Sequence, residues 1–212
     1  ATTYIYTLSL HDALPIFSIL AFVSMPLVVF LFVCSDQIIM LLLGSQWIGA
    51  SSIFRILAIA AFIQPVSTTW GLILLSTGKS SRYFRWGVVN SIVISISFFC
   101  GLAWGTKGVA SAYAIATYLL LYPTLAYAMT ESPIKIYDFF TSISKPLLSS
   151  LSMGIGCWYL LNIMSQFSEL FVISAALVFS IVNYLFFIVL YSLGFNDLKE
   201  YFSYTKVIFS KQ

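Results

Sequence analysis

Six runs of at least 18 predominantly apolar residues, separated by short polar segments, constrain this chain more than any other feature. At 1.5 Å per residue, a helix of about 20 residues crosses a hydrocarbon layer about 30 Å thick. The runs are 17–34, 48–77, 86–103, 109–129, 146–164 and 170–193. None alternates apolar and polar residues at period two, as the strands of a membrane barrel would. The sequence therefore predicts an all-α integral membrane protein with about six transmembrane helices.

Composition agrees with this fold class. Hydrophobic residues make up 60% of the chain and charged residues only 8%, so the chain cannot cover one globule with a polar surface. The net charge of +3 is modest, and we expect no nucleic-acid partner.

Few residues are suited to catalysis or metal binding. The three cysteines, Cys34, Cys100 and Cys157, are odd in number and lie in apolar runs, which predicts neither a disulfide framework nor a CxxC metal site. The only histidine is His11, and no acidic pair lies within a predicted span, so general acid/base catalysis has few candidates. We expect no catalytic residue, no metal site and no cofactor.

Residues 1–16 do not resemble the rest of the chain. They lack an initiator methionine, and the string ATTYIYTLSLHDALPI resembles the translation of a sequencing-library adapter. We expect a non-native leader, with the natural protein continuing upstream of residue 17. The alternative is a natural interfacial helix that leads into the first span.

The first span, 17–34, contains Pro26 near its middle, which predicts a kink because proline removes a backbone donor. Ser35 and Asp36 then suit the N-cap of a short apolar helix over 37–43, too short to cross a membrane again. Gly44 is expected to end that helix.

The second span, 48–77, has 30 residues and would measure about 45 Å as one helix, longer than the hydrocarbon core. Part of it must stand outside. Counting back from its end places Arg55 just outside the core, where it can reach lipid headgroups or approach Asp36.

Gln64 and Pro65 fall close to the middle of the bilayer by the same count. Gln64, Thr68 and Gly71 recur at helical spacing and form a polar, small-residue stripe. Polar and helix-breaking groups at this depth are typical of places where transporters bind or bend. An interhelical hydrogen bond with a packing kink is the other interpretation.

Two connections determine the remaining arrangement. The short turn 104–108 predicts that the spans before and after it are antiparallel neighbours. Residues 130–145 have the spacing of an amphipathic helix that lies in the membrane interface. Asn90 and Asn183 are single polar residues within spans, and we expect each to form an interhelical hydrogen bond.

Lysine and arginine predict the orientation. Eight of the ten lie in the 78–85 loop and its border, in 130–145 or in the tail 194–212: Lys79, Arg82, Arg85, Lys135, Lys145, Lys199, Lys206 and Lys211. The positive-inside rule places these segments and the C-terminus in the cytoplasm. We expect the basic cluster to meet anionic membrane lipid.

Four strings in register carry a family resemblance. They are LLLGSQWIGA at 41–50, FRILAIAAFIQP at 54–65, TGKSSRYFRWG at 77–87 and WGTKGVASAYAIAT at 104–117. With them the chain from residue 17 resembles the C-terminal part of a bacterial polysaccharide transporter. That family comprises the oligosaccharide-lipid flippases within the multidrug/oligosaccharidyl-lipid/polysaccharide exporter superfamily.

The resemblance implies a larger protein of roughly 12 to 14 spans, whose two lobes alternate between inward-open and outward-open states. Residues 17–129 would be the end of the second lobe and 146–193 a final pair of spans, with the N-terminal lobe as the missing partner. The implied substrate is an undecaprenyl-pyrophosphate-linked oligosaccharide, such as an O-antigen (lipopolysaccharide) or exopolysaccharide repeat unit, moved across the bacterial inner membrane. The residues we nominate for substrate contact are Gln64, Thr68, Asn90, Arg55 and Arg85.

Two other functions remain open. A cation-coupled drug antiporter of the same superfamily would be favoured by acidic residues within spans, and Asp36 lies only at an end. A membrane enzyme such as a polysaccharide polymerase or ligase would have a large outer loop with arginine and histidine, whereas the predicted outer loops are short.

Overall fold

Helices account for all the secondary structure in the part of the chain that the computed structural model describes, residues 13–67, 71, 74–75, 78–130, 136–164 and 166–191. This confirms the predicted all-α class. The long helices are α2 (Ala13–Val33), α4 (Ser51–Ser67), α6 (Ser80–Gly101), α7 (Gly105–Met129), α8 (Ile136–Ile163) and α9 (Glu169–Tyr191). The short ones are α3 (Ser35–Leu43) and the 3-10 turns η1 (Ser45–Ala50) and η2 (Leu102–Trp104).

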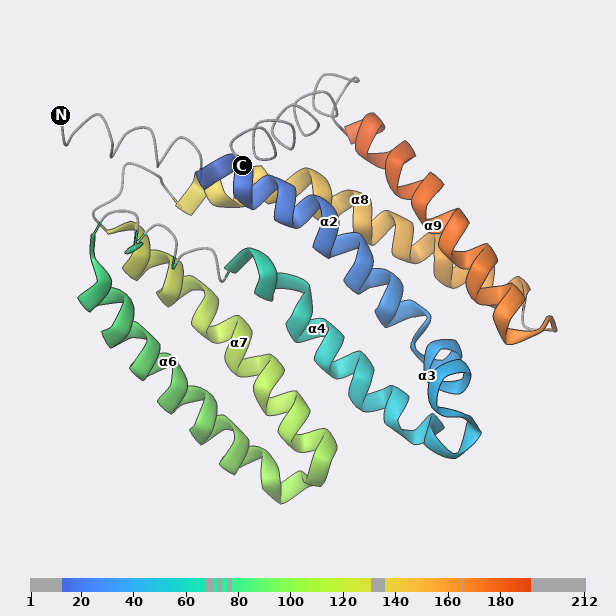
Figure 1. Ribbon diagram of the computed structural model, residues 1–212, viewed down its shortest axis with the longest axis horizontal. Coiled ribbons are helices and arrows are strands. Elements are labelled where there is room, and N and C mark those ends of the chain that lie inside the picture. Colours follow the sequence, from blue (N-terminus) through green and yellow to red (C-terminus); the bar gives the residue numbers. More distant parts are fainter. Residues whose placement is uncertain are drawn as a thin grey trace, which may run out of the picture.

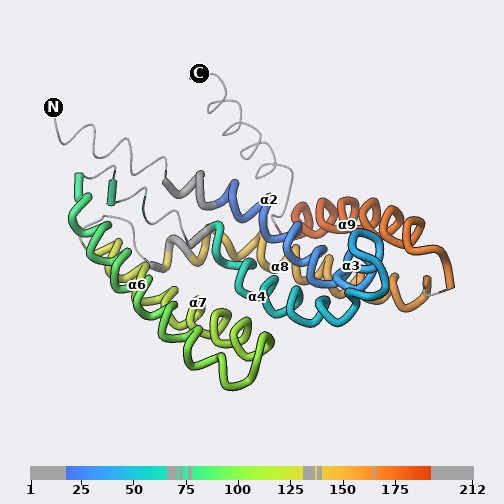
Figure 2. The backbone as a smooth tube through the Cα atoms, turned by 60° about the horizontal axis from the view of Figure 1, so that its bottom comes forward, coloured from blue at the N-terminus to red at the C-terminus, as the bar shows by residue number. Residues whose placement is uncertain are grey.

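The long helices form a curved row rather than a closed bundle (Figures 1 and 2). Each packs mainly on the next in the spatial order α6, α7, α4, α2, α8, α9. The turns α3/η1, α6–α7 and α8–α9 lie on one side, at the lower right of Figure 1. The start of α6, the end of α7 and the start of α8 lie on the other side. We call the first the turn side and the second the basic side, because Arg82 and Arg85 lie in the first turns of α6.

Among the described residues, four helical stretches can cross a membrane by length and composition, or five if the bent pair α2 and α3 forms one span. One of the four, Ser80–Met129, has 50 residues and contains both α6 and α7. Since these two helices run antiparallel in Figure 1, the described helices are compatible with six crossings. The chain is a multi-pass membrane protein.

The chain bends at Cys34, where the axes of α2 and α3 differ by 76°. Pro26 lies inside α2, which continues through it as one helix, and the kink expected there stays a prediction. The predicted N-cap is wrong. Cys34 occupies the cap position without a side-chain cap, while Ser35 and Asp36 already belong to α3. Their side chains are drawn instead to Arg55, as described below.

Several helices begin earlier than the apolar runs suggested. The basic residues of 78–85 lie mostly inside the first turns of α6, since that helix begins at Ser80. Residues 136–145, predicted as part of an interfacial segment, are continuous with the following span through Pro146. Both helices begin with polar residues before the apolar run, and hydropathy alone does not detect such a beginning. Residues 1–12, 131–135 and 192–212 lie outside the described residues, and so do most of the predicted leader and the tail.

Glycines bring α6 and α7 together at their turn. Gly105 has a φ of 68°, a left-handed conformation that favours glycine and lets the chain reverse. A Cβ atom on Gly101 would lie 2.6 Å from the Val109 Cα and 2.7 Å from the Gly108 carbonyl oxygen. The predicted antiparallel pairing is confirmed, and it depends on backbone contact between these residues.

Three clusters of buried side chains join the middle of the row. One contains Met25, Leu125 and Ile143, which are almost fully buried between α2, α7 and α8. A second joins Val29 of α2 to Met153 of α8 and the third contains Cys34. The outer helices α6 and α9 leave most apolar side chains exposed, as lipid contact requires.

Tyr184 in α9 donates a hydrogen bond of 2.9 Å to the Phe22 carbonyl oxygen of α2. We expect Tyr184→Phe to lower the free energy of unfolding by about 0.5–1.5 kcal/mol, because the hydroxyl joins two helices in an apolar medium. Thermal unfolding in detergent measures the change. The control is Tyr159→Phe, which removes the hydroxyl of a 66% exposed tyrosine of α8 and should change nothing. Equal melting temperatures for both variants would contradict the prediction.

Candidate functional site

A pocket with mostly polar walls lies at the turn side of the row, and we call it the polar pocket. Its volume is about 280 Å³. It is formed where the bend after α2 meets the first turn of α4, the end of α8 and the start of α9. Its polar walls comprise Asp36, Gln37, Arg55, Asn162 and Glu169.

Arg55 is anchored by the α2–α3 bend. Its Nε donates a hydrogen bond of 2.6 Å to the Ser35 hydroxyl, and its Nη2 pairs with an Asp36 carboxylate oxygen. Of the two positions predicted for Arg55, the approach to Asp36 is confirmed. The bend at Cys34 turns the start of α3 toward α4, which brings residues 19 and 20 positions apart into contact.

The Arg55–Asp36 pair should contribute little to stability, since the side chains are 41% and 44% exposed. A double-mutant cycle with Arg55→Gln and Asp36→Asn should give a coupling free energy of about 0.2–1 kcal/mol, decreasing as salt increases. Chemical or thermal unfolding of the four proteins in detergent measures it. A coupling several times larger and insensitive to salt would contradict this account.

Charge determines what the polar pocket can accept. One arginine faces two carboxylates, Asp36 and Glu169, so the walls carry a net negative charge at neutral pH. The side-chain amide oxygen of Gln37, Oε1, is buried and has no hydrogen-bond donor among the described residues. The pocket therefore suits a donor-rich or neutral polar group better than a pyrophosphate, and Arg55 does not behave as a free phosphate-binding cation.

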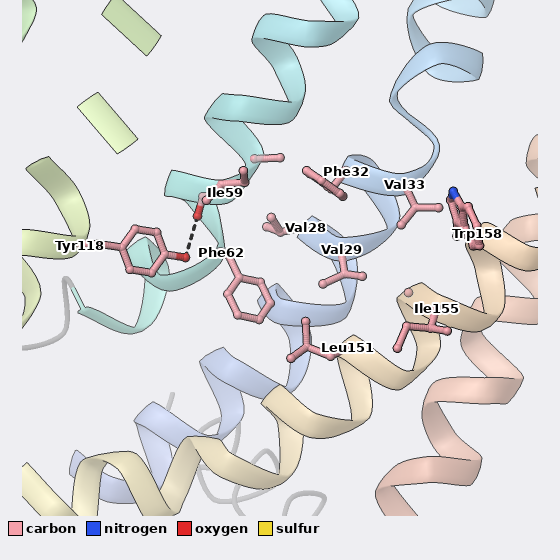
Figure 3. A pocket seen from close by; sticks show the side chains of 12 residues that line it. Val28, Val29, Phe32, Val33, Ile59, Phe62, Tyr118, Leu151, Ile155 and Trp158 are labelled. Atoms are coloured by element: carbon pink, nitrogen blue, oxygen red, sulfur yellow. Dashed lines mark hydrogen bonds between the residues drawn. The ribbon is translucent and has the colours of Figure 1, made fainter. Parts of the chain in front are cut away.

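An apolar groove of about 550 Å³ adjoins the polar pocket, and the two share Val33 and Trp158. Figure 3 shows side chains of α2, α4 and α8 converging on it, with Tyr118 of α7 at its rim. The Tyr118 hydroxyl donates a hydrogen bond of 2.9 Å to the Ile59 carbonyl oxygen. Since this bond engages the Tyr118 hydroxyl and the Trp158 indole nitrogen is the one other polar side-chain atom of the lining, the groove presents an almost entirely apolar wall.

Gln64 lies on an exposed part of α4, one residue before Pro65. Its side-chain nitrogen donates a hydrogen bond of 2.9 Å to the hydroxyl of Tyr113 in α7, and Tyr113 packs against Phe98 of α6. This is the interhelical bond that we weighed against a binding role, and it leaves the amide exposed. Thr68, the next residue of the predicted stripe, lies outside the described residues.

Aromatic contacts hold the basic end of the α6–α7 pair. Arg82 donates a hydrogen bond of 2.9 Å to the Tyr127 carbonyl oxygen and lies 4.6 Å from that ring's centre. Trp86 stacks on Tyr127 at 5.0 Å and donates to the Thr124 hydroxyl. Arg85 is exposed. Of these two arginines, Arg82 is therefore held by the fold and Arg85 is accessible.

The expected hydrogen bonds of the two asparagines do not form within the described part of the chain. Asn90 is half-buried on α6, and no described residue bonds its side chain. The side-chain amide oxygen of Asn183, Oδ1, is also buried and has no hydrogen-bond donor among the described residues. Gly156 of α8 lies opposite: a Cβ there would be 3.2 Å from the Asn183 amide nitrogen.

Of the nominated residues that the structure describes, Arg55, Gln64 and Arg85 do not form one site. Arg55 lies near the turn side and Arg85 near the basic side, while Gln64 lies on α4 between α2 and α7 (Figure 1).

Sequence reasoning missed Asn162 and Glu169, because their nearness to Asp36 depends on the α8–α9 turn folding back toward α3. It also missed Tyr113 and Tyr118, because nothing in the sequence distinguishes these two tyrosines from the others in the chain. Within the described residues, no three His, Cys, Asp or Glu side chains form a group suited to a metal ion.

Comparison with known proteins indicates polysaccharide biosynthesis. Residues 12–52 match a family described as "Polysaccharide biosynthesis protein". Teichuronic acid biosynthesis protein TuaB of Bacillus subtilis (strain 168) is 31% identical to this chain over 140 residues. The match covers 64% of this chain and 28% of TuaB, so the chain corresponds to under a third of that relative's length. No solved structure matches. The chain is thus a multi-pass membrane protein with distant similarity to a polysaccharide biosynthesis protein.

Proposed function

We propose that this chain is part of a bacterial exporter that moves a lipid-linked oligosaccharide across the cytoplasmic membrane by alternating access. The observation that carries the proposal is the similarity to TuaB over 140 residues, combined with an all-helical, multi-pass fold. The substrate class, an oligosaccharide on undecaprenyl pyrophosphate, follows from the family resemblance of the four sequence strings. Neither a membrane enzyme nor a drug antiporter gains a supporting observation from the described residues.

The open row of helices supports an exporter lobe that works with a second lobe. Because each long helix packs mainly on its neighbours in the row rather than around a common centre, both faces of the row remain open to another partner. In the proposed exporter, one face meets lipid and the other meets the second lobe and the substrate path. Gln64, with its exposed amide bonded to Tyr113, supplies a polar group on this path, and we propose that Thr68 and Asn90 contribute to it too.

We propose that the basic side faces the cytoplasm and meets the anionic groups of lipid or substrate. Arg85 is an exposed cation there, whereas Arg82 is bound to Tyr127. Arg55 is assigned to the fold rather than to the substrate, because Asp36 and Ser35 engage it.

The two arginines make a matched pair for testing this assignment. In the complete protein, Arg85→Gln should reduce export several-fold while leaving the melting temperature unchanged, because its guanidinium makes no described contact with the fold. Arg82→Gln should lower the melting temperature, since it removes the bond to the Tyr127 carbonyl and the stacking on the ring. Surface polysaccharide and thermal unfolding are measured for both. Unchanged export by the Arg85 variant would contradict its role.

Complementation tests the function itself. The complete gene should restore surface polysaccharide to a strain that lacks its own oligosaccharide-lipid flippase. Immunoblotting of membranes confirms expression, and a version carrying Gly108→Leu serves as an unfolded control. Absence of surface polysaccharide despite normal membrane levels, with several different glycans offered, would overturn the proposal.

A further inference from the structure

Two of the three cysteines meet at the α2–α3 bend. Cys34 occupies the bend, Cys157 lies on α8, and their sulfur atoms are 3.9 Å apart although 123 residues separate them in sequence. Both are fully buried, and Ala176 of α9 closes the cluster around them. The odd number of cysteines predicted no disulfide framework, but the fold brings one pair together and leaves Cys100 exposed on α6.

We propose that Cys34 and Cys157 form a redox-active pair, whose disulfide joins the α2–α3 bend to α8. The sulfurs already touch, so side-chain torsions and a small helix movement bring them within bonding distance. The bond would cross the α2–α8 interface, next to the 76° bend. It would therefore fix the position of α3, and with it the floor of the polar pocket. This inference does not rest on the proposed function.

The polar pocket gives a reagent access to this pair. Val33 and Trp158 line the pocket, and each is the chain neighbour of one of the two cysteines. The pocket therefore borders the residues that adjoin the two thiols in the chain. The orientation predicted from lysine and arginine places the pocket on the extracytoplasmic side, where protein disulfides persist.

The chemistry is thiol–disulfide exchange with a small-molecule disulfide. The thiolate of one cysteine attacks a sulfur of the reagent, giving a mixed disulfide and one free reagent thiol. The second cysteine loses its proton, attacks the protein sulfur and displaces the other reagent thiol. Two protein thiols and one reagent disulfide therefore become one protein disulfide and two reagent thiols, with both protons carried by the leaving thiols. Excess dithiothreitol reverses both steps.

The test uses native membranes that contain the complete protein, with 4,4′-dithiodipyridine as the probe. After treatment, denaturation and maleimide labelling, Cys34 and Cys157 should both be blocked. Mass spectrometry should find their two peptides joined, with the loss of two hydrogen atoms and no retained pyridine group. Cys100→Ser should react in the same way. Cys34→Ser and Cys157→Ser should instead retain the reagent on the remaining partner or stay unreacted.

The joined protein should also resist heat. A disulfide that closes so long a loop is expected to raise the melting temperature by about 5 °C or more, reversibly with dithiothreitol. The mass of the Cys34 and Cys157 peptides from the wild-type protein tests the proposal without any variant. Free Cys34 and Cys157 after prolonged treatment would overturn the proposal and make the pair a packing contact. So would joining only through Cys100, or joining no faster in membranes than in unfolded protein.

Discussion

Gly101→Leu and Gly108→Leu each prevent the α6–α7 pair from closing and lower the free energy of unfolding by about 3 kcal/mol or more. A Cβ on Gly101 would lie 2.6 Å from the Val109 Cα, and one on Gly108 would lie 2.5 Å from the Trp104 Cβ. The Val109 Cα belongs to the backbone, and the Trp104 Cβ is bonded directly to it. Neither atom can move aside as the end of a flexible side chain would. The yield of monodisperse protein after detergent extraction, with thermal unfolding, measures the effect.

Gly87→Ala is the matched control on the same helix. A Cβ on Gly87 would meet nothing within 4 Å, and alanine has the higher helix propensity. This variant should therefore keep the yield and melting temperature of the parent or raise them slightly. If the Gly101 and Gly108 variants behaved like Gly87→Ala, the close approach of α6 and α7 would be wrong.

Gly154→Leu separates α2 from α8 and is the other substitution with a large expected effect. A Cβ at Gly154 would lie 2.5 Å from Val29 Cγ1, and Val29 is itself packed in the core between these helices. Valine has one strongly preferred rotamer in a helix, so the loss of stability should be about 1–3 kcal/mol or more. The side chain would also intrude into the apolar groove, since Gly154 forms part of its wall.

Ile155→Ala is the control for Gly154→Leu, because it changes the same groove wall without placing an atom between α2 and α8. Ile155 is the next residue of α8, lies in the same groove wall and is 70% exposed, so its truncation should cost little. Thermal unfolding in one detergent compares both variants with the parent. A larger loss for Ile155→Ala than for Gly154→Leu would contradict the packing of α2 on α8.

The number and type of the long helices could be predicted from sequence because the membrane imposes both. Any segment that crosses hydrocarbon must satisfy its backbone internally, so each long apolar run becomes a helix whatever lies beside it. The order of the row could not be predicted in this way. Apolar periodicity does not say that α4 packs between α2 and α7, since lipid and a neighbouring helix are equally apolar.

The bend and the polar pocket show where sequence reasoning failed. The 76° bend at Cys34 could not be predicted, because cysteine has no intrinsic tendency to break a helix. Arg55 and Asp36 were paired correctly as one of two interpretations, because they are close in sequence on either side of a turn. Glu169 and Asn162 were not, because only tertiary structure places them beside Asp36. Substrate contact by Gln64, Thr68, Asn90 and Arg85 stays a prediction.

The most direct measurement of the proposed function is the sidedness of a lipid-linked oligosaccharide when the complete protein is depleted. Cells are converted to sealed right-side-out vesicles, and a membrane-impermeant glycosidase reports the fraction of the oligosaccharide that faces outward. With the protein present, outward-facing oligosaccharide should form and be cleaved. After depletion, the intermediate should accumulate protected from the enzyme. Equal cleavage with and without the protein, or disappearance of the intermediate altogether, would contradict transport and favour a role in synthesis.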